Sequence, residues 1–152
     1  PRIYAVGECA SHRGIAYGLV APLYEQGKVV ANHLAHMGIG RYSGSQVSTK
    51  LKVTGIDLFS AGDFMGADGT ESIFLRDPMS GTYKKLVMSG NKLVGACLYG
   101  DTADGSWYFK LIREGTPVNH LRSRLMFGES MAQMAMENQA VAAASAPISM
   151  AA

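Results

Sequence analysis

Gly7 and Glu8 lie where a short apolar run, residues 3–6, gives way to polar sequence. Such a run is typical of a buried strand, and in open α/β sheets ligands bind at the carboxyl ends of the strands. Glycine allows a ligand to approach the backbone closely, and a carboxylate accepts hydrogen bonds from ligand hydroxyls. The pair therefore predicts one side of a ligand site. The alternative is that Glu8 is only a solvated loop residue.

Pro22 indicates a second contribution to the same site. Proline suits the first turn of a helix, where its missing N–H costs nothing. The free N–H groups and the positive dipole end of such a helix attract electron-rich groups. Together with Glu8, this helix start predicts half of a site for a ligand that carries both a polyol and an electron-rich ring.

The sequence contains no complete catalytic or metal-binding motif. It has no glycine-rich dinucleotide loop, no P-loop and no GxSxG nucleophile turn. His33 and His36 share one face of a predicted helix, but zinc needs three or four protein ligands. Cys9 and Cys97 are far apart and are expected to be small buried hydrophobic residues rather than cluster ligands. We therefore expect no catalytic residue and no metal ligand in this chain.

The composition indicates a globular protein. The chain has 152 residues, a formal charge of +2, 47% hydrophobic and 17% charged residues. There is no apolar run of membrane-spanning length and no block of lysine and arginine, so neither a membrane nor a nucleic acid is the expected partner. The two cysteines fit a reducing compartment, and we expect the cytoplasm. The chain starts at Pro1, directly before an apolar strand, and is expected to be a piece of a longer protein.

Residues 1–40 carry the pattern of half a βαβ unit. A strand at residues 3–6 and a loop at 11–18 precede a helix that includes Pro22 and is expected to stop at Gly38. The helix is predicted from apolar residues at helical spacing: Leu19, Leu23, Val30, Leu34 and Met37. We interpret this segment as the C-terminal remnant of an α/β dinucleotide-binding domain.

Residues 41–130 change to the pattern of an antiparallel sheet. Strands are predicted at 49–53, 56–61, 72–75, 83–88 and 93–99, with a turn at 77–81 and a two-residue hairpin at Gly90 and Asn91. The short connections favour a meander. Two helices are expected to follow, over 107–114 and from Pro117 to Gly128, the second with Val118, Leu121 and Leu125 on its apolar stripe. Residues 131–152 indicate a weakly helical linker. The predicted fold class is α+β: an antiparallel sheet with two C-terminal helices, preceded by the strand–helix remnant.

The segments YAVGECA at 4–10 and YGLVAP at 17–22 resemble a known motif. They are similar to the second FAD-binding motif of flavoprotein reductases with two dinucleotide-binding domains, the pyridine nucleotide-disulfide reductase-like family. Further segments resemble, in order, the next domain of one subgroup, the large subunits of assimilatory NAD(P)H-dependent nitrite reductases: residues 48–57, 98–102, 106–111 and 125–130.

This resemblance implies roles for four residues. Glu8 would accept hydrogen bonds from the ribityl chain of FAD, beside Gly7, and the backbone around Pro22 and Leu23 would face the pyrimidine edge of the flavin. The family often has Asp where this chain has Glu8. The implied parent passes electrons from NAD(P)H through FAD toward the reduction of nitrite to ammonia, with its iron–sulfur cluster and sirohaem outside this fragment. The fragment alone is expected to be inert.

The partners that the resemblance implies are the remainder of the parent chain and the small subunit of nitrite reductase. The apolar strand and the helix stripe of residues 1–40 also predict pairing with a second copy of the chain. An alternative is a non-catalytic dimerisation or electron-acceptor docking module of a rubredoxin- or ferredoxin-reductase-like flavoprotein. The lysines at 50, 52, 84 and 85 are expected at strand edges, where lysine prevents edge pairing. A docking patch is the other interpretation of these lysines.

Overall fold

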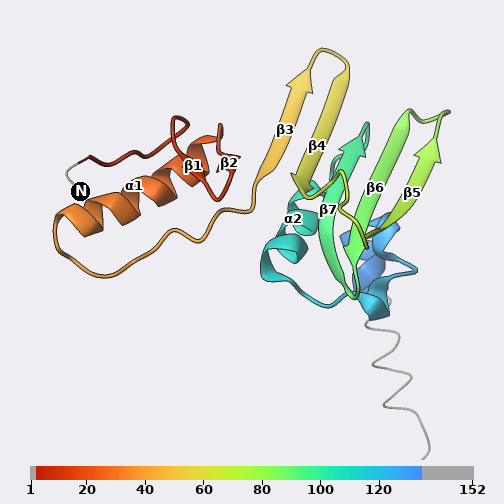
Figure 1. The fold of residues 1–152 in the computed structure, drawn as a ribbon. Coiled ribbons are helices and arrows are strands. Elements are labelled where there is room, and N and C mark those ends of the chain that lie inside the picture. The colour runs from red at the N-terminus through yellow and green to blue at the C-terminus, as the bar shows by residue number, and fades with distance from the viewer. Residues whose placement is uncertain (1–2, 135–152) are drawn as a thin grey trace, which may run out of the picture. The chain divides into compact units, whose positions relative to one another are not determined.

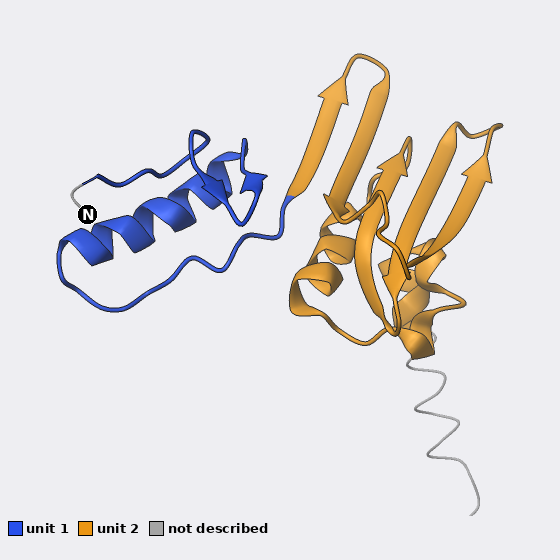
Figure 2. Cartoon of the chain, in the orientation of Figure 1, with its two compact units in different colours: residues 1–47 blue, residues 48–152 orange. Residues whose placement is uncertain are grey.

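The computed structural model describes residues 3–134, which divide into two compact units (Figures 1 and 2). The first unit runs to Val47 and the second starts at Ser48. The second unit contains an antiparallel sheet and short helices, so the predicted α+β class is confirmed. Between residues 3 and 134, no helix has the length and apolar character needed to cross a membrane.

A two-strand hairpin and one long helix form the first unit. Strands β1 (Ser11–His12) and β2 (Ile15–Ala16) pair antiparallel in the region expected to be a loop, and helix α1 follows at Val20–Leu34. The hairpin turn uses Arg13 and Gly14, both at positive φ, which suits a two-residue hairpin connection.

Helix α1 ends before the predicted stop at Gly38. His36 adopts φ 54°, and the N–H groups of His36 and Met37 donate to the carbonyl oxygens of His33 and Asn32. This is a Schellman-type end, which a residue other than glycine can adopt at some cost. The hydrogen-bonded end at His36 terminates the helix earlier than the glycine would.

The predicted strand at residues 3–6 is wrong for this structure. These residues are exposed and not in a strand; Ile3 has 91% of its surface accessible. A strand needs a neighbour to pair its N–H and C=O groups, and no strand in the described chain lies beside this run.

The second unit is built on five antiparallel strands. They are β3 (Ser48–Val53), β4 (Ile56–Gly62), β5 (Glu71–Asp77), β6 (Thr82–Ser89) and β7 (Lys92–Tyr99). All five predicted strands are present. The two-residue connection predicted at Gly90 and Asn91 is confirmed, and the turn after Asp77 joins β5 to β6.

The order of the strands in the sheet is β3-β4-β7-β6-β5, which is not a simple meander. In a meander β4 would pair with β5; instead β7 lies between β4 and β6. The connection at 63–70 therefore crosses the sheet. A side chain on Gly95 would overlap the backbone of Asp63, and one on Gly66 would contact Val87, so this connection passes directly over β7 and β6.

Helix α2 (Gly105–Glu114) covers the other face of the sheet (Figure 1). It ends at Gly115, which has φ 61° as its predicted role as a cap requires. Tyr108 is fully buried, and Trp107 and Phe109 pack at the edge of the core. The core contains these residues of the sheet and of the segments that follow it: Phe59, Ala61, Leu86, Met88, Leu93, Ala96, Leu98, Tyr108, Leu111, Ile112, Val118, Leu121, Leu125, Met126 and Ala132.

The second predicted C-terminal helix is replaced by two 3₁₀ turns, η1 (Asn119–Leu121) and η2 (Leu125–Phe127). The apolar residues expected on its stripe are buried, but Val118 donates its N–H to the carbonyl oxygen of Asn91. That bond ties the chain to the β6–β7 hairpin. From residue 129 the chain is helical to residue 134; the rest of the predicted 131–152 linker lies outside the described residues.

Candidate functional site

Gly7 begins the tight turn that presents Glu8. Its φ of 99° favours glycine, and its N–H donates to Oε1 of Gln26 on α1 at 2.9 Å. The N–H of Ala10 donates back to the carbonyl oxygen of Gly7 at 3.0 Å. The turn is thus fixed at both ends, and the Glu8 side chain is exposed to solvent.

Glu8 lies close to Gly18, in the segment that directly precedes helix α1. Its carboxylate Oε1 is 3.5 Å from the point where a Cβ on Gly18 would stand. Leu19 occupies the N-cap position and supplies no side-chain hydrogen bond, so the first N–H groups of α1 have no side-chain cap. A carboxylate acceptor therefore lies near the segment that leads into the start of α1.

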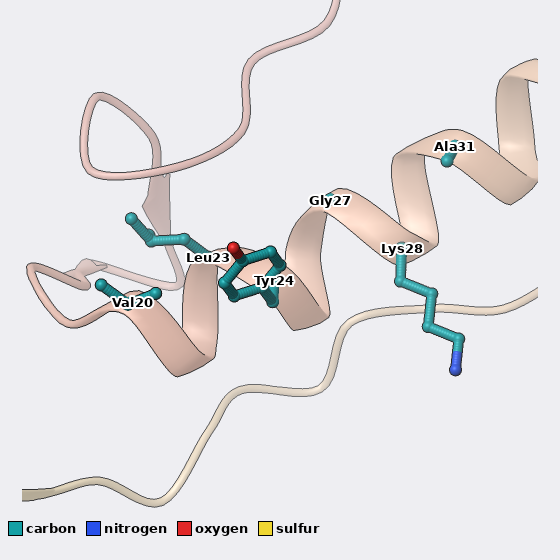
Figure 3. Close-up of a pocket in the computed structure, with 6 residues that line it drawn as sticks. All are labelled: Val20, Leu23, Tyr24, Gly27, Lys28 and Ala31. Carbon is teal, nitrogen blue, oxygen red and sulfur yellow. The ribbon is translucent and has the colours of Figure 1, made fainter.

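Pro22 and Leu23 occupy the first turns of α1 but face different surroundings. Pro22 is buried in the unit, whereas Leu23 is half-buried. Leu23 lines a shallow groove along the helix (Figure 3), together with Val20, Tyr24, Gly27, Lys28 and Ala31. Of the predicted apolar stripe, Leu23 lies on this groove and Leu34 is exposed, whereas Val30 lines a second cavity, against the N-terminal segment.

Sequence reasoning did not identify Gln26, which positions the Gly7 turn. Gln26 is buried, and its Nε2 has no hydrogen-bond partner within the described residues; His12 Nε2 has none either. Both residues line the same small cavity between α1 and the N-terminal segment. The sequence feature that indicates Gln26 is its spacing: it lies four residues after Pro22 and therefore on the same face of the helix. The expectation for Cys9 was wrong, because its side chain is exposed.

The charged cluster of the second unit is structural. Lys84 lies on the interior strand β6, not at an edge as expected, and is buried on the core side. Its Nζ is 2.7 Å from Asp101 Oδ2 and 3.8 Å from Asp104 Oδ2. Hydrogen bonding to Lys84 lowers the pKa of Asp101. Asp104 in turn accepts the N–H of Glu129 at 3.0 Å, so the cluster ties the sheet to the C-terminal segment.

The arrangement around Gly7 and Glu8 fits a flavin only in part. The residues supply an acceptor for ribityl hydroxyls and uncapped N–H groups for an electron-rich ring edge, which are the two functions that such a ligand needs. They supply no glycine-rich loop for a pyrophosphate. Bound FAD would provide hydride and electron transfer, and this chain would provide hydrogen bonds and orientation.

Comparison with known proteins finds relatives of this sequence. Residues 48–116 match the model of the Rubredoxin NAD+ reductase C-terminal domain. The chain is 51% identical over 119 residues to the NAD(P)H nitrite reductase of Bacillus subtilis, and 41% identical over 107 residues to the large subunit of the NADH nitrite reductase of Escherichia coli. The chain is homologous to a segment of the nitrite reductase large subunits.

The homologous segment is a small part of these proteins. The matched region covers 78% of this chain but 15% of the Bacillus subtilis nitrite reductase. A second relative from Bacillus subtilis, the assimilatory nitrate reductase electron transfer subunit, is 51% identical over 104 residues, which are 68% of this chain and 14% of that protein. The nitrite reductase relatives therefore extend well beyond the region compared.

A solved structure supports the fold. The NADH:rubredoxin oxidoreductase of Clostridium acetobutylicum superposes with a TM-score of 0.58 at 22% sequence identity. The superposition covers 90% of this chain and 33% of that one. At this identity the likeness concerns the fold.

Proposed function

We propose that this chain is the part of a nitrite reductase large subunit that completes the flavin site and supplies the reductase C-terminal domain. In this proposal the parent passes electrons from NAD(P)H through FAD toward nitrite, which is reduced to ammonia. The 51% identity to the Bacillus subtilis NAD(P)H nitrite reductase carries the proposal. The iron–sulfur cluster, the sirohaem and the NAD(P)H site belong to other parts of the parent, which is proposed to act in the cytoplasm.

Residues 1–40 are proposed as the end of the FAD domain, and Gly7, Glu8, Pro22 and Leu23 as its contribution to cofactor binding. The supporting geometry is the fixed turn at Gly7 and the carboxylate of Glu8 beside the uncapped start of α1. Residues 41–130 are proposed as the reductase C-terminal domain, and 131–152 as the linker to the next part. Proposed partners are the remainder of the parent chain and the small subunit of nitrite reductase.

The experiment is a chimera in which this chain replaces the homologous segment of the Bacillus subtilis enzyme. We expect the purified chimera to retain FAD and to reduce nitrite with NAD(P)H. Glu8→Ala in the chimera should lower its FAD content and raise the FAD concentration needed for half-maximal activity. Glu114→Ala, at the exposed end of α2, is the matched control and should leave both unchanged. A folded chimera that binds no flavin would contradict the proposal.

The isolated 152-residue chain is proposed to be catalytically inert, because its sequence has no pyrophosphate-binding loop. FAD titration followed by flavin fluorescence tests the half-site directly. Weak binding that Glu8→Ala abolishes would support the assignment of residues 1–40. Oxidation of NADH by the isolated chain would contradict its inertness.

A second candidate is a docking or dimerisation module. It is favoured by the match of residues 48–116 to a domain named for rubredoxin NAD+ reductase, and by the relative named as an electron transfer subunit. In this function the second unit would contact another protein without contacting flavin. Retention of nitrite reduction by a chimera that lacks residues 48–134 but binds FAD normally would leave this candidate without support.

A further inference from the structure

The five-stranded sheet has one face without a covering helix. Successive side chains of a strand point to opposite faces, so every residue next to a core-facing residue lies on this face. The strand register aligns these residues in rows across the five strands. Within residues 48–134, α2 and the C-terminal core residues pack on the other side. We call this the open face, defined by Leu51, Val53, Ile56, Leu58, Phe74, Arg76, Tyr83, Lys85, Cys97 and Tyr99.

The open face is apolar or aromatic at most of these positions, and the register adds two small polar residues, Thr49 and Ser60. One row of directly opposed residues consists of Leu51, Leu58, Tyr99 and Tyr83, ending at Arg76. Leu51, Val53, Ile56, Phe74 and Tyr99 keep between 39% and 58% of their surface exposed. The connection at 63–70 covers one end of this face, over Gly95 and Val87, and extends as far as Lys85, which bonds to Met65. A contiguous set of accessible apolar residues of this kind marks an interaction surface.

Two positive charges border these apolar residues. The Arg76 guanidinium carbon lies 5.9 Å from the centre of the Tyr83 ring, and Lys85 Nζ lies 5.9 Å from the centre of the Phe74 ring. Lys85 also donates to the carbonyl oxygen of Met65 at 2.9 Å. Neither cation has an ion-pair partner among the described residues, and no carboxylate occupies a register position on the open face.

We propose that the open face docks another protein through a surface that has an apolar centre and carboxylates at one border. Arg76 and Lys85 are diagonal neighbours on β5 and β6, so their Cα atoms are about 7–8 Å apart. Two acidic residues of the partner would pair with them. Apolar side chains of the partner would cover Leu58 and Tyr99. Docking is measured without flavin, so its failure and the failure of the proposed flavin role can be distinguished.

Charge disfavours a second copy of the chain as the occupant. If the twofold axis of a dimer passed through the centre of the face, Arg76 and Lys85 of one copy would lie over Leu51 and Ile56 of the other. If the axis passed through the positively charged border, the cations of the two copies would face each other. Either arrangement leaves Arg76 and Lys85 without a carboxylate. The aliphatic residues Leu51, Leu58 and Ile56 disfavour a nucleic acid, since leucine and isoleucine neither stack on bases nor contact phosphates.

The test uses the full chain, labelled with ¹⁵N, and one probe peptide, acetyl-Glu-Leu-Trp-Asp-Leu-Glu-amide. At low salt we expect amide shifts to move at 73–77, 83–85 and 97–99 and to weaken as salt is raised. Arg76→Gln and Lys85→Gln should each raise the dissociation constant about three-fold. Lys50→Gln and Lys52→Gln, which occupy the core-side register of β3, are the controls and should have no effect.

Three results would overturn the proposal. The first is equal binding of the Gln/Asn isostere of the peptide, which would remove the role of charge. The second is a set of open-face shifts that depends on chain concentration without peptide, which would identify a second copy as the occupant. The third is binding of a twelve-nucleotide oligothymidine at the same residues with higher affinity. Unchanged circular dichroism of each variant ensures that a loss of binding reflects the surface and not the fold.

Discussion

The hydroxyl of Tyr108 donates a hydrogen bond of 2.7 Å to the carbonyl oxygen of Leu125, and both residues are fully buried. This bond joins α2 to the C-terminal turns through the interior of the second unit. Burial raises the pKa of the Tyr108 hydroxyl above its usual range, so the proton that makes the bond stays in place.

Tyr108→Phe should therefore lower the free energy of unfolding by about 1–3 kcal/mol, because the buried carbonyl oxygen of Leu125 loses its donor. The measurement is urea denaturation followed by circular dichroism. Tyr99→Phe is the matched control, since Tyr99 is 42% exposed, and it should change stability little. Equal effects of the two substitutions would show that the Tyr108 bond contributes nothing specific.

Gly128→Ala should be the more harmful of two glycine substitutions. Gly128 has φ 90°, and a Cβ there would overlap the carboxylate of Asp104. The backbone conformation and the overlap together should cost about 3 kcal/mol. Gly81→Ala shares the positive φ but has open space around it, and should cost about 1 kcal/mol. Thermal unfolding of both variants gives the comparison, and a reversed order would mean that the Asp104 contact yields without strain.

Acid should destabilise the second unit through Asp101. The Lys84 ammonium lowers the pKa of this carboxyl in the folded chain. A lowered folded-state pKa contributes stability above the unfolded-state value, about 3.9, and that contribution is lost as pH falls through the folded-state value. Asp101→Asn should flatten the pH dependence of unfolding in this acidic range.

The same variant should also be less stable at neutral pH, since buried Lys84 loses its nearest partner. Asp77 is the control carboxylate: hydrogen bonds from Ser80 lower its pKa, but it pairs with no cation. Asp77→Asn should flatten the acid limb without leaving a buried charge unpaired. If both variants were equally stable at neutral pH, the ion pair of Lys84 would have no net effect.

Hydrogen exchange should separate the sheet into an outer and an inner part. Strand β3 is an edge strand whose residues from Thr49 to Val53 are all exposed, whereas Leu86 and Leu98 on β6 and β7 are completely buried. Amides of β3 should therefore exchange by local opening, at least ten-fold faster than those of Leu86 and Leu98. Uniform protection across the five strands, measured by NMR near neutral pH, would contradict this.

Local pattern predicted the strands well and their pairing less well. Alternation and turn residues located all five strands and the connection at Gly90 and Asn91. The pairing of β4 with β7 depends on where a longer connection leads, which local pattern does not encode. Lys84 was assigned to an edge because lysine on a strand usually lies there; the carboxylate of Asp101 that permits its burial comes from a distant loop.

At the candidate site, the pattern identified the residue types but not their support. Gly7 and Glu8 were found from a strand-to-turn signal, although the expected strand is not formed. Gln26 was missed because its role depends on α1 turning one face toward the Gly7 turn. The assignment of Gly7, Glu8, Pro22 and Leu23 to FAD remains a prediction.

The position of β7 between β4 and β6 determines the order in which the sheet can assemble. During synthesis, the β3–β4 and β5–β6 hairpins can each form as soon as their own residues are available. No strand pairing links the two hairpins until residues 92–99 have emerged. The last strand made is therefore the one that unites the sheet. A nascent chain that stops before Lys92 would hold two separate hairpins, each with unpaired edges open to association with other chains.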